Sequence, residues 1–132
     1  VERDAASVRA LEPIAEVILA DIEHGPWPLA GRRFAAVVVT HYLWRDLLPS
    51  IIESVAEGGV LIYETFAAGN ETVGRPSNPK FLLRPGELLE VAAALRVVAF
   101  EDGFLCEPER FVQRLVAVRE ATAGAAAMRY PL

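Results

Sequence analysis

Short segments of almost uninterrupted apolar residues alternate along this chain with segments of helical spacing, and this alternation most constrains the fold. Three apolar stretches predict buried β-strands, at residues 17–20, 34–40 and 60–66. Three other segments carry apolar residues at the spacing of amphipathic helices, at residues 4–12, 43–56 and 86–95. Continuous apolar strands separated by helices are typical of a mostly parallel sheet with helices on both faces.

Capping residues suggest where these helices begin and end. Asp4 is a suitable N-cap for the first helix, and Pro13 is a stop signal behind it. Pro49 lies inside the second helical segment and marks either its true start or a kink. The glycine pair at residues 58–59 predicts the C-cap of that helix. Glu87 suits the first turn of the third helix, where the helix dipole favours a carboxylate.

The last apolar stretches, at residues 96–100 and 111–119, are close in sequence with no helix between them. They therefore predict an antiparallel hairpin. Residues 67–85 form a long loop, and loops of that length inside a compact domain are usually lids or binding loops. The alanine-rich residues 121–132 predict a tail that is either a short helix or disordered. One domain over residues 1–120 and a tail over 121–132 follow.

Length, composition and charge exclude several classes of protein. A chain of 132 residues that is 53% hydrophobic can form one core, and disorder is a poor interpretation. The net charge of −5 argues against binding nucleic acid through its phosphates. No apolar run reaches the ~18 residues of a membrane span. The lone Cys106 excludes an internal disulfide and a multi-cysteine zinc site, and no metal is expected. The charged first residues lack the apolar core of a signal peptide, so we expect a cytoplasmic protein.

Several strings of the sequence, in this order, resemble one protein family. They are ADIE at 20–23, WPL at 27–29, VVTHYL at 38–43, GVLIYETF at 59–66, GNE at 69–71, GRPSNP at 74–79 and FLLRPGELL at 81–89. Together with the terminal hairpin, they resemble class I S-adenosylmethionine-dependent methyltransferases, in particular the tellurite-resistance-type branch. The resemblance implies an α/β, Rossmann-like fold with S-adenosylmethionine as its cofactor.

The resemblance also implies cofactor-binding positions. Glu2 would hold the ribose hydroxyls, Asp21 and Ile22 would contact the adenine, and Thr40 would lie at the next strand end. On the residues alone, a solvated terminal carboxylate is the better interpretation of Glu2, and Asp21 is also a plausible turn residue. The family's Gly-rich turn after the first strand has no match, because no Gly-x-Gly occurs. We therefore expect a domain that is incomplete at its N-terminus, beginning at the tip of the second strand, and belonging to a longer molecule.

The substrate side of the expected crevice offers five polar residues. His41 is a candidate general base, since its ordinary pKa is near neutral, although it is equally a capping residue. Tyr42 is a weaker catalytic candidate and also a candidate pocket wall. Glu64 ends its strand and faces either substrate or loop amides. Arg75 and Asn78, in the long loop, are candidates to hold a polar or anionic substrate.

The sequence therefore predicts an enzyme that transfers a methyl group from S-adenosylmethionine to a small nucleophile. A rival hypothesis is a non-catalytic, truncated methyltransferase-like domain that acts in oligomerisation or scaffolding. This hypothesis rests on the apolar strand edges, which would be exposed if the preceding strands are absent. Exposed apolar edges favour a homo-oligomer. A dinucleotide oxidoreductase is a weaker alternative, because its glycine fingerprint is also missing.

Overall fold

A computed structural model describes residues 1–121 and 129–131 of the chain. The chain divides into two compact units, Val1–Arg32 and Arg33–Leu132, and each is described by itself. Of the expected tail at 121–132, residues 122–128 and 132 lie outside the described residues. In the part that the structure describes, no helix is long and apolar enough to cross a membrane.

The first unit contains one short helix, α1 (Ala5–Leu11). Asp4 is its N-cap, as expected, because its carboxylate accepts a hydrogen bond from the Ser7 backbone N–H at 2.7 Å. The helix buries Val8 and ends two residues before Pro13, in agreement with the sequence.

The predicted strand at residues 17–20 is wrong. Leu19 forms only an isolated parallel bridge with Glu2. The Glu2 N–H donates to the Ile18 carbonyl and the Ala20 N–H donates to the Glu2 carbonyl, both at 2.9 Å. A single paired residue gives too little ladder to make a strand, despite the apolar sequence. This bridge nevertheless lays the start of the chain alongside the residues that precede Asp21.

The second unit is built on one four-stranded sheet. Its strands are β1 (Phe34–Thr40), β2 (Val55–Phe66), β3 (Arg96–Cys106) and β4 (Glu109–Val118), in the spatial order β1-β2-β4-β3. β1 and β2 are parallel, whereas β2–β4 and β3–β4 are antiparallel. The predicted terminal hairpin is confirmed as β3–β4. The expectation of a mostly parallel sheet is wrong, because a mixed sheet results when the long hairpin supplies half of the strands.

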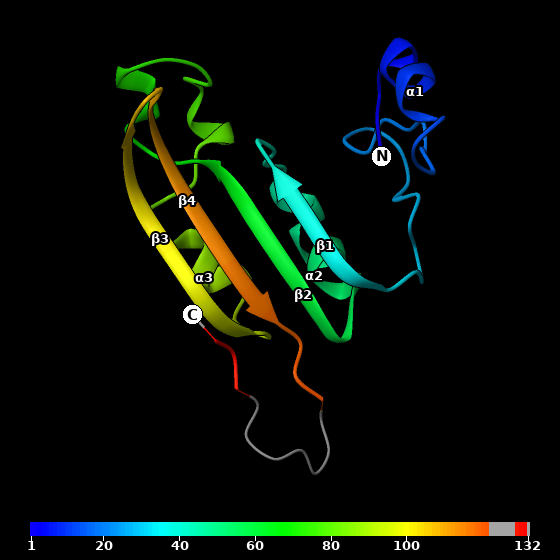
Figure 1. Ribbon diagram of the computed structural model, residues 1–132. Helices are drawn as coiled ribbons and strands as arrows, with labels where there is room; N and C mark the ends of the chain where they lie inside the picture. The colour runs from blue at the N-terminus through cyan, green and yellow to red at the C-terminus, as the bar shows by residue number, and fades with distance from the viewer. Residues whose placement is uncertain (122–128, 132) are drawn as a thin grey trace. The chain divides into compact units, whose positions relative to one another are not determined.

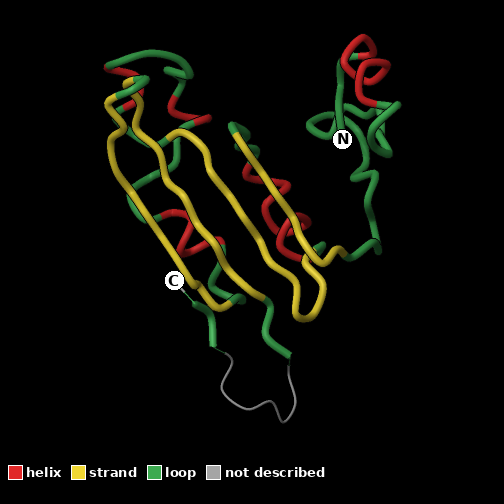
Figure 2. The backbone as a smooth tube through the Cα atoms, viewed as in Figure 1, coloured by secondary structure: helices red, strands yellow, loops and turns green. Residues whose placement is uncertain are grey.

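Two short helices pack on this sheet, α2 (Leu48–Glu53) and α3 (Glu87–Val91), and they contact each other on the same side (Figures 1 and 2). Leu61 and Tyr63 of β2 are buried beneath them. The alternate residues point the other way, and Ile62 and its register partner Val38 are 42% and 62% exposed. The expected cover of helices on both faces is therefore not confirmed, because both α-helices among the described residues of the second unit lie on one face.

The predicted helix at 43–56 is shorter than expected. A 3₁₀ turn η1 (Arg45–Leu47) leads into α2, and Pro49 lies in its first turn, as the sequence suggested. The glycine pair does not cap this helix, because β2 has already begun at Val55. A Cβ on Gly59 would lie 2.8 Å from the carbonyl oxygens of Ala56 and Phe34, so only glycine fits at this irregular stretch of the β1–β2 ladder.

The long loop at 67–85 is an ordered structure with two 3₁₀ turns, η2 (Asn70–Thr72) and η3 (Pro79–Phe81). Asn70 is almost fully buried and ties the loop together. Its side chain donates to the Pro76 carbonyl at 3.0 Å and accepts from the Phe111 N–H at 3.2 Å. The following helix, predicted over residues 86–95, is α3; it begins at Glu87, after Gly86 as its N-cap, and ends at Val91, well short of residue 95.

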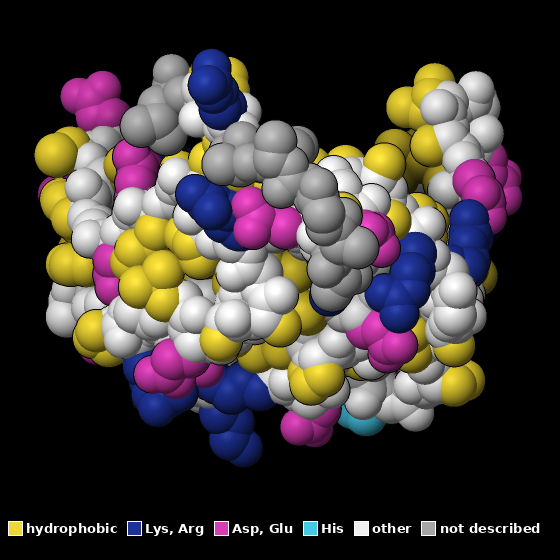
Figure 3. Space-filling model, turned by 90° about the horizontal axis from the view of Figure 1, so that it is seen from below, with side chains coloured by type: hydrophobic (Ala, Val, Ile, Leu, Met, Phe, Trp, Pro, Cys, Tyr) yellow, Lys and Arg dark blue, Asp and Glu magenta, His cyan; other side chains and the backbone are white. Residues whose placement is uncertain are grey.

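Charged side chains on the lower surface lie in pairs of opposite sign with hydrophobic side chains between them (Figure 3). Two such pairs within the second unit are Arg33 with Glu53, at 3.5 Å, and Arg84 with Glu90, at 3.1 Å. Exposed pairs of this kind contribute little to stability, typically under ~1 kcal/mol each.

Candidate functional site at the carboxyl ends of the parallel strands

The parallel strands β1 and β2 end at the same edge of the sheet, which is where open α/β sheets bind ligands. Thr40, the last residue of β1, is in register with Glu64 of β2. The His41 N–H donates to the Glu64 carbonyl at 2.9 Å. The structure thus brings together three of the residues singled out from the sequence: Thr40, His41 and Glu64.

His41 has an unusual backbone for a non-glycine residue, with φ = 52°. Left-handed backbone is disfavoured for residues with a Cβ, although His is among the residue types that adopt it more often. The conformation turns the imidazole over the ring of Phe66, at 5.2 Å between ring centroids and 25° between planes. Local strain of this kind clusters at functional sites.

Glu64 lies among three nitrogen-bearing side chains. Arg114 Nε donates to Glu64 Oε2 at 2.6 Å, while His41 Nε2 and an Arg110 terminal nitrogen lie 3.8 and 3.9 Å from Oε1. Arg114 also reaches Glu101 at 3.4 Å. The hydrogen bond to Glu64, and then the charges of both carboxylates, raise the pKa of the Arg114 guanidinium.

Arg110 was not identified from the sequence as a site residue. Its Nε is buried and has no hydrogen-bond partner among the residues that the structure describes. A buried donor without a partner is rare and suggests a ligand or water at that position. One signal was present in the sequence: Arg110 directly precedes the predicted strand at 111–119 and Arg114 lies four residues later, a spacing that places both on the same face of a strand.

The candidate cofactor residues Glu2, Asp21 and Ile22 belong to the first unit. Glu2 Oε1 accepts hydrogen bonds from the next two backbone N–H groups, at 2.7 and 2.8 Å. Asp21 Oδ1 accepts from the N–H groups of Glu23 and His24, and its Oδ2 lies 3.1 Å from His24 Nδ1. The hydrogen bond with His24 is the main cause that lowers the pKa of Asp21. Both carboxylates are therefore held by local contacts.

The remaining substrate candidates from the sequence are Asn78, Arg75 and Tyr42. Asn78 is exposed and caps η3, accepting from the Lys80 N–H at 3.0 Å. Arg75 is an exposed residue of the same loop. Tyr42 is half-buried, and its carbonyl accepts from the Tyr63 hydroxyl at 2.8 Å. Burial, above all, raises the pKa of Tyr63.

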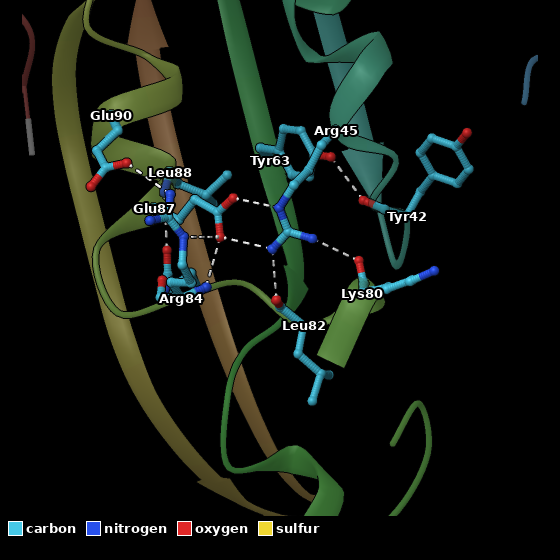
Figure 4. A network of polar contacts seen from close by, with 10 residues as sticks. Tyr42, Arg45, Tyr63, Lys80, Leu82, Arg84, Glu87, Leu88 and Glu90 are labelled. Carbon is cyan, nitrogen blue, oxygen red and sulfur yellow. Dashed lines mark hydrogen bonds and ion pairs between the residues drawn. The ribbon is translucent and has the colours of Figure 1, made fainter. Parts of the chain in front are cut away.

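A second polar network lies beside α3 and supports the end of the long loop at residues 67–85 (Figure 4). Arg45 binds the carboxylate of Glu87 and also donates to the carbonyls of Lys80 and Leu82, at 2.7 and 2.9 Å. Burial alone would raise the pKa of Glu87, but hydrogen bonds from Arg45 and from the Arg84 N–H leave it below its ordinary value. Sequence spacing gives no sign of this network.

Comparison with solved structures reveals a relative in fold. The fold is similar to that of TehB from Haemophilus influenzae. The TM-score with TehB is 0.65 at 20% sequence identity, over 91% of this chain and 48% of TehB. This chain thus spans about half the length of TehB, and the match supports a mixed α/β, Rossmann-like fold.

Comparisons of the sequence with family models and with curated proteins found no match. Among the described residues, no group of three or more His, Cys, Asp or Glu side chains could hold a metal ion.

Proposed function

We propose that this chain contributes the acceptor side of an S-adenosylmethionine-dependent methyltransferase domain, which methylates a small nucleophile. Two observations support the proposal: the fold similarity to TehB, and the sequence strings that resemble tellurite-resistance-type methyltransferases. The observation that carries the proposal is the cluster of Glu64, His41, Arg110 and Arg114 at the carboxyl ends of β1 and β2. It is a polar, partly buried site at the ligand-binding edge of the sheet.

The residues of the first unit fit the adenosine end of the cofactor. The Glu2–Leu19 bridge places the Glu2 and Asp21 segments side by side and parallel. Ionised carboxylates accept hydrogen bonds from a ribose diol or an adenine amino group. The methionine end is not matched, because the sequence has no Gly-x-Gly turn. When bound, the cofactor supplies an activated methyl group, which leaves the protein to position the acceptor.

Each residue of the acceptor cluster has a separate task in this proposal. Arg114 orients the Glu64 carboxylate through a short, charge-assisted hydrogen bond. Glu64 and His41 are the groups that would receive a proton from an acceptor that arrives protonated. Thr40 and the His41–Phe66 ring pair line the same strand ends.

Calorimetric titration with S-adenosylhomocysteine tests the cofactor assignment. We expect weak but saturable binding, because only the adenosine end is matched, and loss of that binding in Asp21→Ala. Asp46→Ala, at an exposed aspartate of η1 in the second unit, is the matched control and should bind like the unaltered protein. Undetectable binding by the unaltered protein, or equal binding by Asp21→Ala, would overturn the assignment.

A second candidate function, a non-catalytic interaction domain, is favoured by one observation. Val38 and Ile62 are register partners and both are exposed on the sheet face opposite α2 and α3. Exposed apolar residues on an edge strand promote association between chains. Size-exclusion chromatography with light scattering tests this function: a dimer that Val38→Lys converts to a monomer would support it, and a monomeric unaltered protein would refute it.

A further inference from the structure

The two carboxylate oxygens of Glu64 are used differently. Oε2 accepts a direct hydrogen bond from Arg114 Nε at 2.6 Å. Oε1 lies 3.8 Å from His41 Nε2 and 3.9 Å from an Arg110 terminal nitrogen, and both distances exceed a direct hydrogen bond. Gaps of this size between polar groups are commonly bridged by a water or a ligand atom. Oε1 is therefore an acceptor placed to receive a bridging donor.

Arg110 supplies the complementary group. Its Nε is a buried donor with no partner among the described residues, and its side chain is only 25% exposed, close to the 24% of Glu64. A buried donor left without an acceptor costs about 1–3 kcal/mol, so a ligand that satisfies it gains affinity. A ligand that serves both Arg110 Nε and Glu64 Oε1 must carry an acceptor and a donor together.

The charges of the cluster indicate what kind of ligand this is. Two arginines, Arg110 and Arg114, face two carboxylates, Glu64 and Glu101, so the formal charges sum to zero when His41 is neutral. A multiply charged oxyanion would have to approach Glu64, which repels it, and compete for an Arg114 that is already engaged. A neutral group with one polar hydrogen meets neither obstacle.

We infer that the methyl acceptor is an uncharged thiol or hydroxyl compound, which donates its hydrogen to Glu64 Oε1 and accepts from Arg110 Nε. This inference rests on the proposed function. In the reaction, the sulfur or oxygen lone pair of the acceptor forms the bond to the methyl carbon as the methyl–sulfonium bond breaks. The electron pair of the broken bond stays on the departing sulfur, and the acceptor's proton passes to Glu64 Oε1 and then to water.

Binding measured without cofactor tests the inference directly. We would follow the Nε–H signals of Arg110 and Arg114 by NMR during titration with 2-mercaptoethanol, a neutral thiol and hydroxyl compound, and with inorganic phosphate, an oxyanion. We expect a saturable shift of the Arg110 signal with 2-mercaptoethanol, at concentrations at least tenfold below any effect of phosphate. Tighter binding of phosphate would overturn the assigned substrate class.

Variants connect this preference to the two groups. In Glu64→Gln, we expect 2-mercaptoethanol affinity to fall at least tenfold and phosphate affinity to rise, because a negative charge is removed. Glu57→Gln, at an exposed carboxylate of the same strand β2, is the matched control and should retain the original preference. If Glu64→Gln binds 2-mercaptoethanol and phosphate with the same two affinities as the unaltered protein, the role of Glu64 is refuted.

A second variant keeps the inference testable if Glu64→Gln does not fold. Arg110→Lys retains the positive charge and removes the guanidinium Nε, so 2-mercaptoethanol binding, followed by the Arg114 signal, should weaken tenfold; unchanged binding would contradict the role of Arg110.

The substrate class can fail without the proposed function failing. If S-adenosylhomocysteine binds but phosphate is preferred over the thiol, only the substrate class fails; if S-adenosylhomocysteine does not bind, the methyltransferase assignment itself fails.

Discussion

Arg45 holds both carboxylate oxygens of Glu87, at 2.8 and 3.0 Å, although the two residues are 42 positions apart in sequence. The Glu87 side chain is only 5% exposed, whereas Arg45 is 38% exposed. This pair joins the turn after β1 to the start of α3. The carbonyl contacts of Arg45 extend the same connection to η3.

Arg45→Met should destabilise the second unit by about 2–4 kcal/mol, because it removes the bidentate partner of the buried Glu87 carboxylate and leaves only Arg84 Nε, at 3.5 Å, as a cation. This range lies a little below the ~3–5 kcal/mol for fully buried pairs, since Arg45 is partly exposed. Urea unfolding followed by circular dichroism measures the change. Glu90→Gln, which breaks the exposed pair with Arg84, is the control and should cost under ~1 kcal/mol. Equal losses in the two variants would contradict the special role of Arg45.

Acid should weaken the protein through Glu87. The folded-state pKa of Glu87 is below its ordinary value of 4.5, so its contribution to stability is complete above that value and is lost as the pH falls through the folded pKa. Glu87→Gln cannot titrate at this position. The difference in unfolding free energy between the unaltered protein and Glu87→Gln should therefore be largest above about pH 5 and shrink towards pH 3. A difference that is independent of pH would show that the charge of Glu87 does not matter.

Asn70 is predicted to be the anchor of the long loop. In Asn70→Asp the acceptor for the Phe111 N–H remains, but the donor to the Pro76 carbonyl is lost and a negative charge is buried. We expect a loss of roughly 1–3 kcal/mol and faster amide hydrogen exchange in residues 71–78. Asn78→Asp, at an exposed position of the same loop, keeps its capping acceptor and should have little effect. Unchanged exchange in Asn70→Asp would rule out the anchoring role.

Gly69 should not tolerate a side chain. Its φ is +104°, and a Cβ there would lie 2.9–3.0 Å from the ring of Phe111. Gly69→Ala should cost at least ~2 kcal/mol through backbone strain and displacement of that ring. Gly74→Ala, in the same loop with no atom within 4 Å of the added carbon, should lose less than ~0.5 kcal/mol. Thermal melts of the two variants compare them directly, and similar melting temperatures would disprove the prediction.

Local patterns in the sequence predicted much of the fold. The β3–β4 hairpin followed from two apolar stretches with no helix between them, and Asp4 and Pro49 marked the starts of their helices. The expectation at residues 17–20 was wrong because an apolar run indicates burial but does not name a partner strand. The prediction that the glycine pair at 58–59 caps a helix was wrong. Glycine is required at position 59 because the Phe34 carbonyl oxygen approaches it closely, and local sequence does not reveal that contact.

The candidate site was predictable only in part. Thr40, His41 and Glu64 were found because polar residues that end apolar strands meet at one sheet edge. Arg110 and Arg114 were not, because their relation to Glu64 depends on the register between β2 and β4. Register is a tertiary property, and no periodicity within one strand encodes it.

The position of the polar residues near the strand ends separates the residues that specify the fold from those that form the proposed site. The buried residues of β2 specify the sheet, whereas the polar residues within two positions of the strand ends form the proposed site. Mutations at positions 40, 41 and 64 should therefore alter the proposed site without disturbing Leu61 and Tyr63 in the core. Similarity of backbone and identity of sequence are thus separable, as in the match of this chain to TehB at a TM-score of 0.65 with only 20% of residues identical.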